Sequence, residues 1–261
     1  MRQFLHSGPL GDLLYSLCAV QAMGGGVLYT HKGLGDFLRP LLVRQPYISE
    51  VREFQEYPPR GRRRTNRMNN EPLRLYSAKH GELINLDRFK QHRTRADRAT
   101  FYSPAWYVDM LQELSGYTMP DFTTPWITLK TPPEPQAPIV ICCTSSYHDI
   151  EEIDWSLLTD YTDHIIFHGF PRDYAYFTER YGIYPRFITC DTALGLAELI
   201  AGSKLFIGNL SGSYAVAECM KHPRVLETCS AIAPLGGPVG SNGATTLTRE
   251  ILDEKTLWGI T

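Results

Sequence analysis

Short apolar segments alternate with helical or turn-rich stretches along this 261-residue chain, and this alternation most constrains its fold. Strands are expected at 1–5, 27–30, 51–54, 139–143, 165–168 and 204–208, and an amphipathic helix near 106–114. The segment 131–138 contains four prolines, which exclude both a helix and a central strand. We therefore predict two doubly wound α/β domains, 1–130 and 139–261, joined by a proline-rich linker at 131–138.

Composition narrows the class of protein. With 43% hydrophobic residues the chain can bury sizeable cores. No apolar run approaches the roughly 18 residues of a membrane-spanning helix, and the N-terminus shows no charged-then-apolar leader. The six cysteines have no Cys-x-x-Cys spacing. We expect a cytoplasmic protein with reduced, structural cysteines, no metal site and no cofactor.

The turn at 6–12 follows the first expected strand and carries the clearest chemical signal. Gly8 and Gly11 allow a ligand to approach the backbone, and Asp12 falls in the first turn of the following helix. The spacing matches neither a dinucleotide fingerprint nor a phosphate-binding loop with its lysine. We predict that Asp12 is catalytic and that Gly8 and Gly11 line a site for a sugar or a phosphate. The alternative is a carboxylate that only stabilises the helix N-terminus.

A basic segment interrupts the first half, within a predicted insertion at 57–98. Between residues 60 and 98, twelve Lys or Arg face four acids, a local charge of +8 in a chain of net charge −2. This asymmetry predicts a polyanionic partner, because arginine binds phosphate in a bidentate fashion. The alternative is a solvated basic loop. The expected contacts to this partner are Arg60, Arg62, Arg63, Arg64 and Arg67.

In the second half, the strand at 204–208 leads into a small, hydroxyl-rich turn and then a helix. Asn209, Ser211, Gly212 and Ser213 would bring backbone N–H groups and hydroxyls to a helix N-terminus, a site suited to a diphosphate. The alternative is an ordinary turn in which Ser211 or Ser213 caps the helix. The spacing is wrong for the nucleophile elbow of a serine hydrolase.

Four segments resemble the heptosyltransferase-like glycosyltransferases of family nine: 11–17, 45–51, 143–146 together with Asp154-Trp155, and 194–223. The resemblance implies the GT-B architecture, in which two Rossmann-like domains face each other across a cleft. It places the acceptor on the first domain, where Gly8, Gly11 and the arginines at 60, 62, 63, 64 and 67 would contact it. It places the nucleotide-sugar donor on the second domain, with Ser145 and Ser146 at the donor.

The chain also departs from that family's pattern. Leu210 stands where the family has an aspartate, Ala215 where it has a histidine, and Asp154 where it has a lysine. Losing the lysine and the histidine removes favourable charge near a diphosphate and calls for compensation, for which His148, His168 and Arg172 are the candidates. Glu218 replaces a small residue; it is expected to bind a ribose diol, or else to lie on a solvated helix face.

The resemblance implies a single displacement with inversion, in which Asp12 removes the proton of the acceptor hydroxyl. The chain lacks an Asp-x-Asp pair, so no metal is expected. The acceptor is either a lipopolysaccharide-type glycan or a hydroxylated base in DNA, as in phage-type enzymes that act on 5-hydroxymethylpyrimidines. A non-catalytic nucleotide- or polyanion-binding protein remains the alternative from another class.

Overall fold

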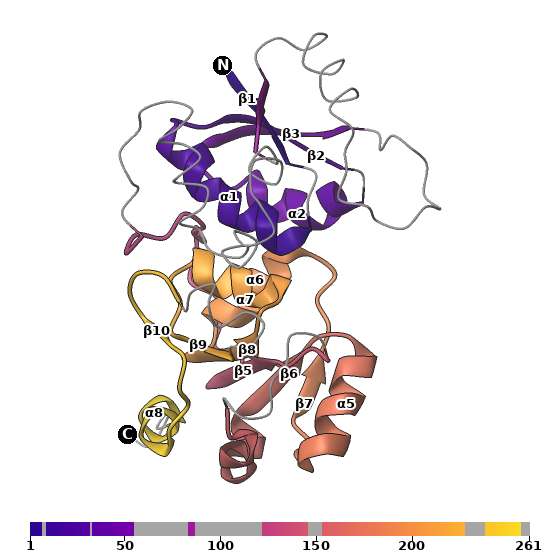
Figure 1. The fold of residues 1–261 in the computed structure, drawn as a ribbon, viewed down its shortest axis with the longest axis vertical. Helices are drawn as coiled ribbons and strands as arrows, with labels where there is room; N and C mark the ends of the chain where they lie inside the picture. The colour runs from indigo at the N-terminus through magenta and orange to yellow at the C-terminus, as the bar shows by residue number, and fades with distance from the viewer. Residues whose placement is uncertain are drawn as a thin grey trace, which may run out of the picture.

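The computed structural model describes residues 1–6, 9–31, 33–54, 83–86, 122–145, 153–227 and 238–256. These residues form two all-parallel sheets, one in each half of the chain (Figure 1). The expected strands near 1–5, 27–30, 51–54, 139–143, 165–168 and 204–208 are confirmed. The expected helix at 106–114, and the basic insertion apart from 83–86, lie outside the described residues.

The first sheet has the strand order β3-β2-β1-β4, and the second has the order β10-β9-β8-β5-β6-β7. Taken from its own first strand, the second sheet follows the 3-2-1-4-5-6 order of a doubly wound nucleotide-binding fold, and the first sheet follows its 3-2-1-4 part. The strands are β1 (Arg2–His6), β2 (Gly26–His31), β3 (Ile48–Phe54), β4 (Leu83–Asn85), β5 (Ile139–Cys142), β6 (Ile165–His168), β7 (Arg186–Ile188), β8 (Leu205–Asn209), β9 (Arg224–Glu227) and β10 (Gly243–Ala244).

The helices form layers around these sheets. Figure 1 shows helices of the first half stacked on helices of the second, between the two sheets, with other helices beyond the second sheet. The helices are α1 (Leu10–Ala22), α2 (Leu34–Leu42), α5 (Pro171–Tyr181), α6 (Ala193–Ala201), α7 (Gly212–Cys219) and α8 (Arg249–Thr256), with the 3₁₀ helix η3 at Trp155–His164. Helix α1 packs on α7, and α2 packs on α6.

One hydrophobic cluster runs through this double helix layer. It joins Phe4 and Leu28 of the first sheet to Val140 and Phe206 of the second. A separate cluster fills the far side of the second sheet, under α5, η3 and α8. The described residues therefore pack the two halves onto a shared core, and the open cleft of a GT-B enzyme stays a prediction.

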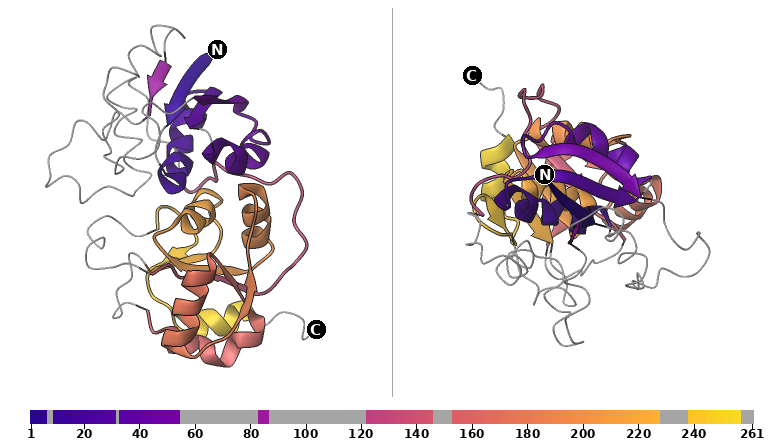
Figure 2. Two further views of the ribbon diagram at one scale, coloured as in Figure 1. Left: turned by 90° about the vertical axis from the view of Figure 1, so that its right-hand side faces the viewer. Right: turned by 90° about the horizontal axis from the view of Figure 1, so that it is seen from above.

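The segment before the linker belongs to both halves. Trp126 donates from its backbone N–H to the carbonyl of Cys219 and from its indole Nε1 to the carbonyl of Leu14. Gln45 bonds Thr128 through both ends of its amide. The proline-rich segment then runs without helix or strand along one side of the molecule into β5, as Figure 2 shows.

Candidate active site

The candidate site lies where the first turns of α1 and α7 meet. A Cβ placed on Gly11 would lie 3.7 Å from the Cβ of Ala215, and one on Gly212 would lie 2.5 Å from Cδ2 of Leu10. The first turn of each helix has N–H groups without a partner inside that helix, and the helix dipole makes this end positive. Two such ends side by side create a region suited to an anionic ligand.

Asp12 lies at the third position of α1, as predicted. Its helix is preceded by Pro9 in an extended conformation, so Asp12 is not the capping residue. The side chain is largely buried, with the residue 8% exposed. A carboxylate is therefore present in the first turn of the helix that packs against the N-terminus of α7.

Ser211 caps the N-terminus of helix α7. The Ser211 hydroxyl accepts a hydrogen bond from the backbone N–H of Tyr214 at 3.2 Å, which matches the capping interpretation for this residue. Gly212 and Ser213 are the first two residues of the helix, and Ser213 is buried. Gly212 packs closely on Leu10, and α1 and α7 can approach each other here because Gly212 has no side chain.

Asn209 ties together the loops that follow β5 and β8. Its Nδ2 donates to the carbonyl of Thr144 at 2.8 Å, and its Oδ1 accepts from the backbone N–H and the hydroxyl of Thr144, both at 3.1 Å. Asn209 is fully buried. These strands flank the point where the strand order reverses, which is where doubly wound sheets bind ligands. The amide thus fixes the shape of this edge.

Ser145, the next residue, is held by Asp173 of α5. The buried Asp173 carboxylate accepts from the Ser145 N–H at 3.3 Å and from its hydroxyl at 3.4 Å. Asp173 was not predicted as a site residue from the sequence. Its position could have been predicted, because it follows a strand and a Gly-Phe-Pro turn and falls in the first turn of a helix, where acids are enriched.

His168 ends β6 on the face that carries Ile166. It is 8% exposed, and burial lowers its pKa, against the raising effect of a hydrogen bond to the backbone of Ile188. Its Nδ1 is buried and has no hydrogen-bond partner among the described residues. His168 therefore lies at the carboxyl end of the second sheet with a buried ring nitrogen that no described residue bonds.

Glu218 belongs to a buried ion cluster, which corrects its expected role. Its carboxylate accepts from Lys221 Nζ at 2.6 Å, Arg224 Nε at 2.7 Å and the Tyr214 hydroxyl at 3.2 Å. The residue is 1% exposed. Because these partners surround both carboxylate oxygens, Glu218 offers none to a ribose, and it does not lie on a solvated helix face. We omit it from the donor site.

Asp154 has a local role. It caps η3, accepting from the backbone N–H of Ser156 at 3.0 Å. The remaining predicted contacts, Gly8, Ser146, His148, Arg60, Arg62, Arg63, Arg64 and Arg67, lie outside the described residues.

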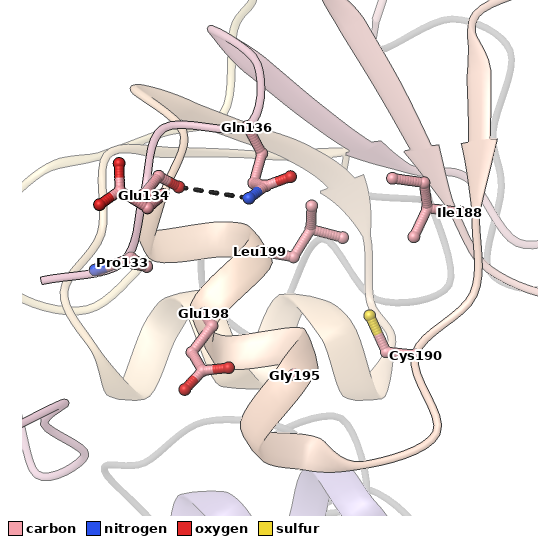
Figure 3. A pocket seen from close by; sticks show the side chains of 8 residues that line it. All are labelled: Pro133, Glu134, Gln136, Ile188, Cys190, Gly195, Glu198 and Leu199. Carbon is pink, nitrogen blue, oxygen red and sulfur yellow. Dashed lines mark hydrogen bonds between the residues drawn. The ribbon is translucent and has the colours of Figure 1, made fainter. Parts of the chain in front are cut away.

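A cavity of about 330 Å³ lies beside α6 (Figure 3). The linker, the end of β7 and α6 form its walls, which include Gln136, Ile188, Cys190, Glu198 and Leu199. None of the described residues that line it is a lysine, arginine or histidine. It is therefore poorly suited to a diphosphate, and the meeting point of α1 and α7 is the better candidate.

Three further properties concern the described residues as a whole. They contain no group of three or more His, Cys, Asp or Glu side chains placed to hold a metal ion. None of their helices is long and apolar enough to cross a membrane. The described cysteines, Cys18, Cys142, Cys143, Cys190 and Cys219, are free thiols.

Comparison with solved structures identifies the fold. A family-nine glycosyl transferase from Veillonella parvula aligns with a TM-score of 0.62 at 17% identity, over 100% of this chain and 90% of the other. The E. coli heptosyltransferase WaaC with ADP aligns with a TM-score of 0.60 at 13% identity, over 98% of this chain and 100% of the other. E. coli ADP-heptose lipopolysaccharide heptosyltransferase II aligns with a TM-score of 0.56 at 14% identity, over 95% of this chain and 90% of the other.

By sequence, no protein-family model and no curated protein matches the chain. The structural alignments extend over both halves and nearly the full length of each neighbour. The chain therefore has the fold of the heptosyltransferase-like glycosyltransferases of family nine.

Proposed function

We propose that this protein is an inverting, metal-independent glycosyltransferase that moves a sugar from a nucleotide-sugar donor to a hydroxyl of a polyanionic acceptor. One observation carries the proposal: the carboxylate of Asp12 lies in the first turn of α1, and this turn packs against the N-terminus of α7. A carboxylate and a helix end suited to an anion are thus side by side where the two halves of the chain meet.

In the proposed reaction, Asp12 takes the proton of the acceptor hydroxyl as its oxygen attacks the anomeric carbon. The bond from that carbon to the diphosphate breaks, and the nucleoside diphosphate leaves with the bonding electron pair. The N–H groups at the start of α7, around Ser211 and Ser213, receive the charge of the leaving group. The buried Asn209 and Asp173 act as positioning residues that fix the loops around it.

The nucleotide-sugar donor is proposed to bind at the carboxyl end of the second sheet. Ser145 lies exposed on the loop after β5, held by Asp173. Nδ1 of His168, at the end of β6, has no hydrogen-bond partner among the described residues. We assign both to the donor, together with Ser211, Gly212 and Ser213. The structural neighbours WaaC and heptosyltransferase II act with ADP-linked heptose or were solved with ADP, which supports a nucleotide-linked donor.

The acceptor is proposed from charge. The excess of twelve basic residues over four acids between 60 and 98 suits a polyanion, either a lipopolysaccharide-type glycan or DNA with a hydroxylated base. Arg62, Arg63 and Arg64 are the densest part of this segment. Their joint replacement by alanine should weaken acceptor binding, leave donor binding unchanged, and make binding less salt-dependent by about one unit of slope per lost phosphate contact.

The deciding experiment incubates the purified chain with a panel of nucleotide sugars and two acceptors, 5-hydroxymethylpyrimidine DNA and truncated lipopolysaccharide, and follows acceptor mass. A gain of one sugar on either acceptor, retained in EDTA, supports the proposal and identifies the acceptor class. Loss of turnover in EDTA would contradict metal independence. No mass gain with any pair would favour the non-catalytic binding protein.

A further inference from the structure

An exposed aromatic side chain lies at the carboxyl end of the second sheet, in the connection from β6 to α5. Phe170 is 65% exposed, although a side chain of this size is usually at least half buried. Pro171 begins α5 and limits the backbone there, and Phe170 itself is extended. The Arg172 guanidinium carbon lies 5.5 Å from the centre of the Phe170 ring. The ring is thus presented on a short, constrained turn.

This turn is connected to the loop that follows β5. Asp173, three residues after Phe170, directs its carboxylate into the protein and bonds the N–H and hydroxyl of Ser145. Its side chain is 3% exposed, so it is not available to a ligand, whereas that of Arg172 is 79% exposed. The position of Phe170 is therefore fixed relative to the edge that Asn209 and Thr144 form.

The strand order indicates what lies beyond this turn. Strand β6 is the second strand of a 3-2-1-4-5-6 sheet, counted from β5. In such sheets the ligand binds outside the carboxyl ends of the strands at the switch point, here β5 and β8, and β6 lies directly beside β5. An exposed ring at that place offers a flat surface of the size of a base.

Resting on the proposed function, we propose that the base of the nucleotide donor stacks on Phe170, with Arg172 as a cation beside it. Phe170 is then a specificity-determining residue for the nucleoside part of the donor. Since every base has a π-face, stacking of this kind binds purine and pyrimidine nucleotides alike. The proposal includes no hydrogen bond from the ribose to a carboxylate, because the Asp173 carboxylate already bonds Ser145.

The test is equilibrium titration of the full chain with ADP, UDP and inorganic pyrophosphate, which lacks a base. Phe170→Ala should weaken ADP and UDP binding about tenfold and leave pyrophosphate binding unchanged. Phe170→Trp should keep nucleotide binding. Tyr184→Ala is the matched control, because Tyr184 is 68% exposed beyond the other end of α5, and it should bind like the wild type.

Each other outcome has a defined meaning. If Phe170→Ala binds ADP and UDP like the wild type, or loses pyrophosphate binding by the same factor, the stacking proposal is overturned while the proposed function stands. If the wild type binds neither ADP nor UDP, both the proposed function and the stacking proposal fall.

Discussion

At the scale of single residues, buried polar side chains organise this protein around its candidate site. Asn209 and Asp173 each fix a loop at the carboxyl edge of the second sheet. Glu218, Lys221 and Arg224 form an ion cluster behind it, with Lys221 4.4 Å from the centre of the Trp126 ring. Removing one partner of a buried ion pair strongly lowers the free energy of unfolding. Substitutions of single residues should therefore distinguish side chains that act in catalysis from those that stabilise the fold.

Asp12→Asn should lower turnover by at least about 100-fold with little change in donor binding, because the amide cannot take the acceptor proton. Asp36→Asn is the matched control: Asp36 has the same position in the first turn of α2 but is exposed. Turnover and nucleotide titration of both variants check this. Turnover of Asp12→Asn within a few-fold of wild type would return Asp12 to a helix-stabilising role.

Glu218→Gln should reduce the free energy of unfolding by about 3–5 kcal/mol, because it leaves Lys221 and Arg224 as buried charges without their counterion. The control is Glu50→Gln, which removes an ion pair with Arg52 of similar length, 2.7 Å, between exposed side chains. The control should unfold like the wild type in urea. Equal urea midpoints for both variants would show that the cluster adds nothing.

Acid should destabilise the protein through His222. Burial, and then the nearby charge of Arg224, lower its pKa from 6.5 to about 4. The unfolded chain takes up the proton first as pH falls, so about 3 kcal/mol of stability, complete above pH 6.5, is lost between pH 6.5 and 4. In urea titrations, the free energy of unfolding of His222→Gln should depend less on pH between 6.5 and 4. The control, His164→Gln at an exposed position, should keep the dependence of the wild type. An unchanged slope in His222→Gln would disprove the assignment.

At the scale of elements, the candidate site depends on close backbone contacts. Gly208 faces β5, and a Cβ there would lie 2.6 Å from the backbone oxygen of Cys142. This contact sets the spacing of β5 and β8 at the edge where Thr144 and Asn209 bond. The first turns of α1 and α7 meet through Gly11 and Gly212 in a similar way. The glycines at these places therefore serve packing between elements.

Gly208→Ala should destabilise the protein by about 1–3 kcal/mol and weaken nucleotide binding, because β5 and β8 must separate. Gly195→Ala provides the control within α6, where the new Cβ would lie 3.6 Å from the Thr192 hydroxyl, an ordinary contact. Urea midpoints and ADP titration of the two variants make the comparison. A Gly208→Ala protein as stable as Gly195→Ala would refute the argument from spacing.

At the scale of the whole molecule, the two sheets share one hydrophobic core through the layer of α1, α2, α6 and α7. Trp126 strengthens this contact, since it bonds the first half at Leu14 and the second at Cys219. Opening the halves would expose this core to water. We expect the two halves to behave as a single cooperative unit.

Urea unfolding should therefore show one transition, with the same midpoint by far-ultraviolet circular dichroism and by tryptophan fluorescence. The buried Trp126 and Trp155 report on the shared core and on the far side of the second sheet. Two separated transitions would mean that the halves are independent domains.

The sequence predicted the elements whose apolar pattern is continuous and missed those whose pattern is broken. Helix α2 contains Pro40 and begins after Gly33, yet it forms because its buried face packs on the sheet and on α6. Strand β9 begins with Arg224 and ends with Glu227, both buried. Arg224 pairs with Glu218, and Glu227 accepts from the Trp155 indole. Each partner belongs to another element, Glu218 to α7 and Trp155 to η3, and such burial depends on contacts between elements.

By itself, the sequence determined the alternating α/β pattern, the two halves around a proline-rich segment, and the position of Asp12 in a first helical turn, because these follow from local periodicity and turn chemistry. Only the tertiary structure decided that α1 meets α7, that Asn209 and Asp173 position loops, and that Glu218 lies inside an ion cluster. Local sequence sets which elements form, whereas the partner of a buried charge is chosen by packing between elements.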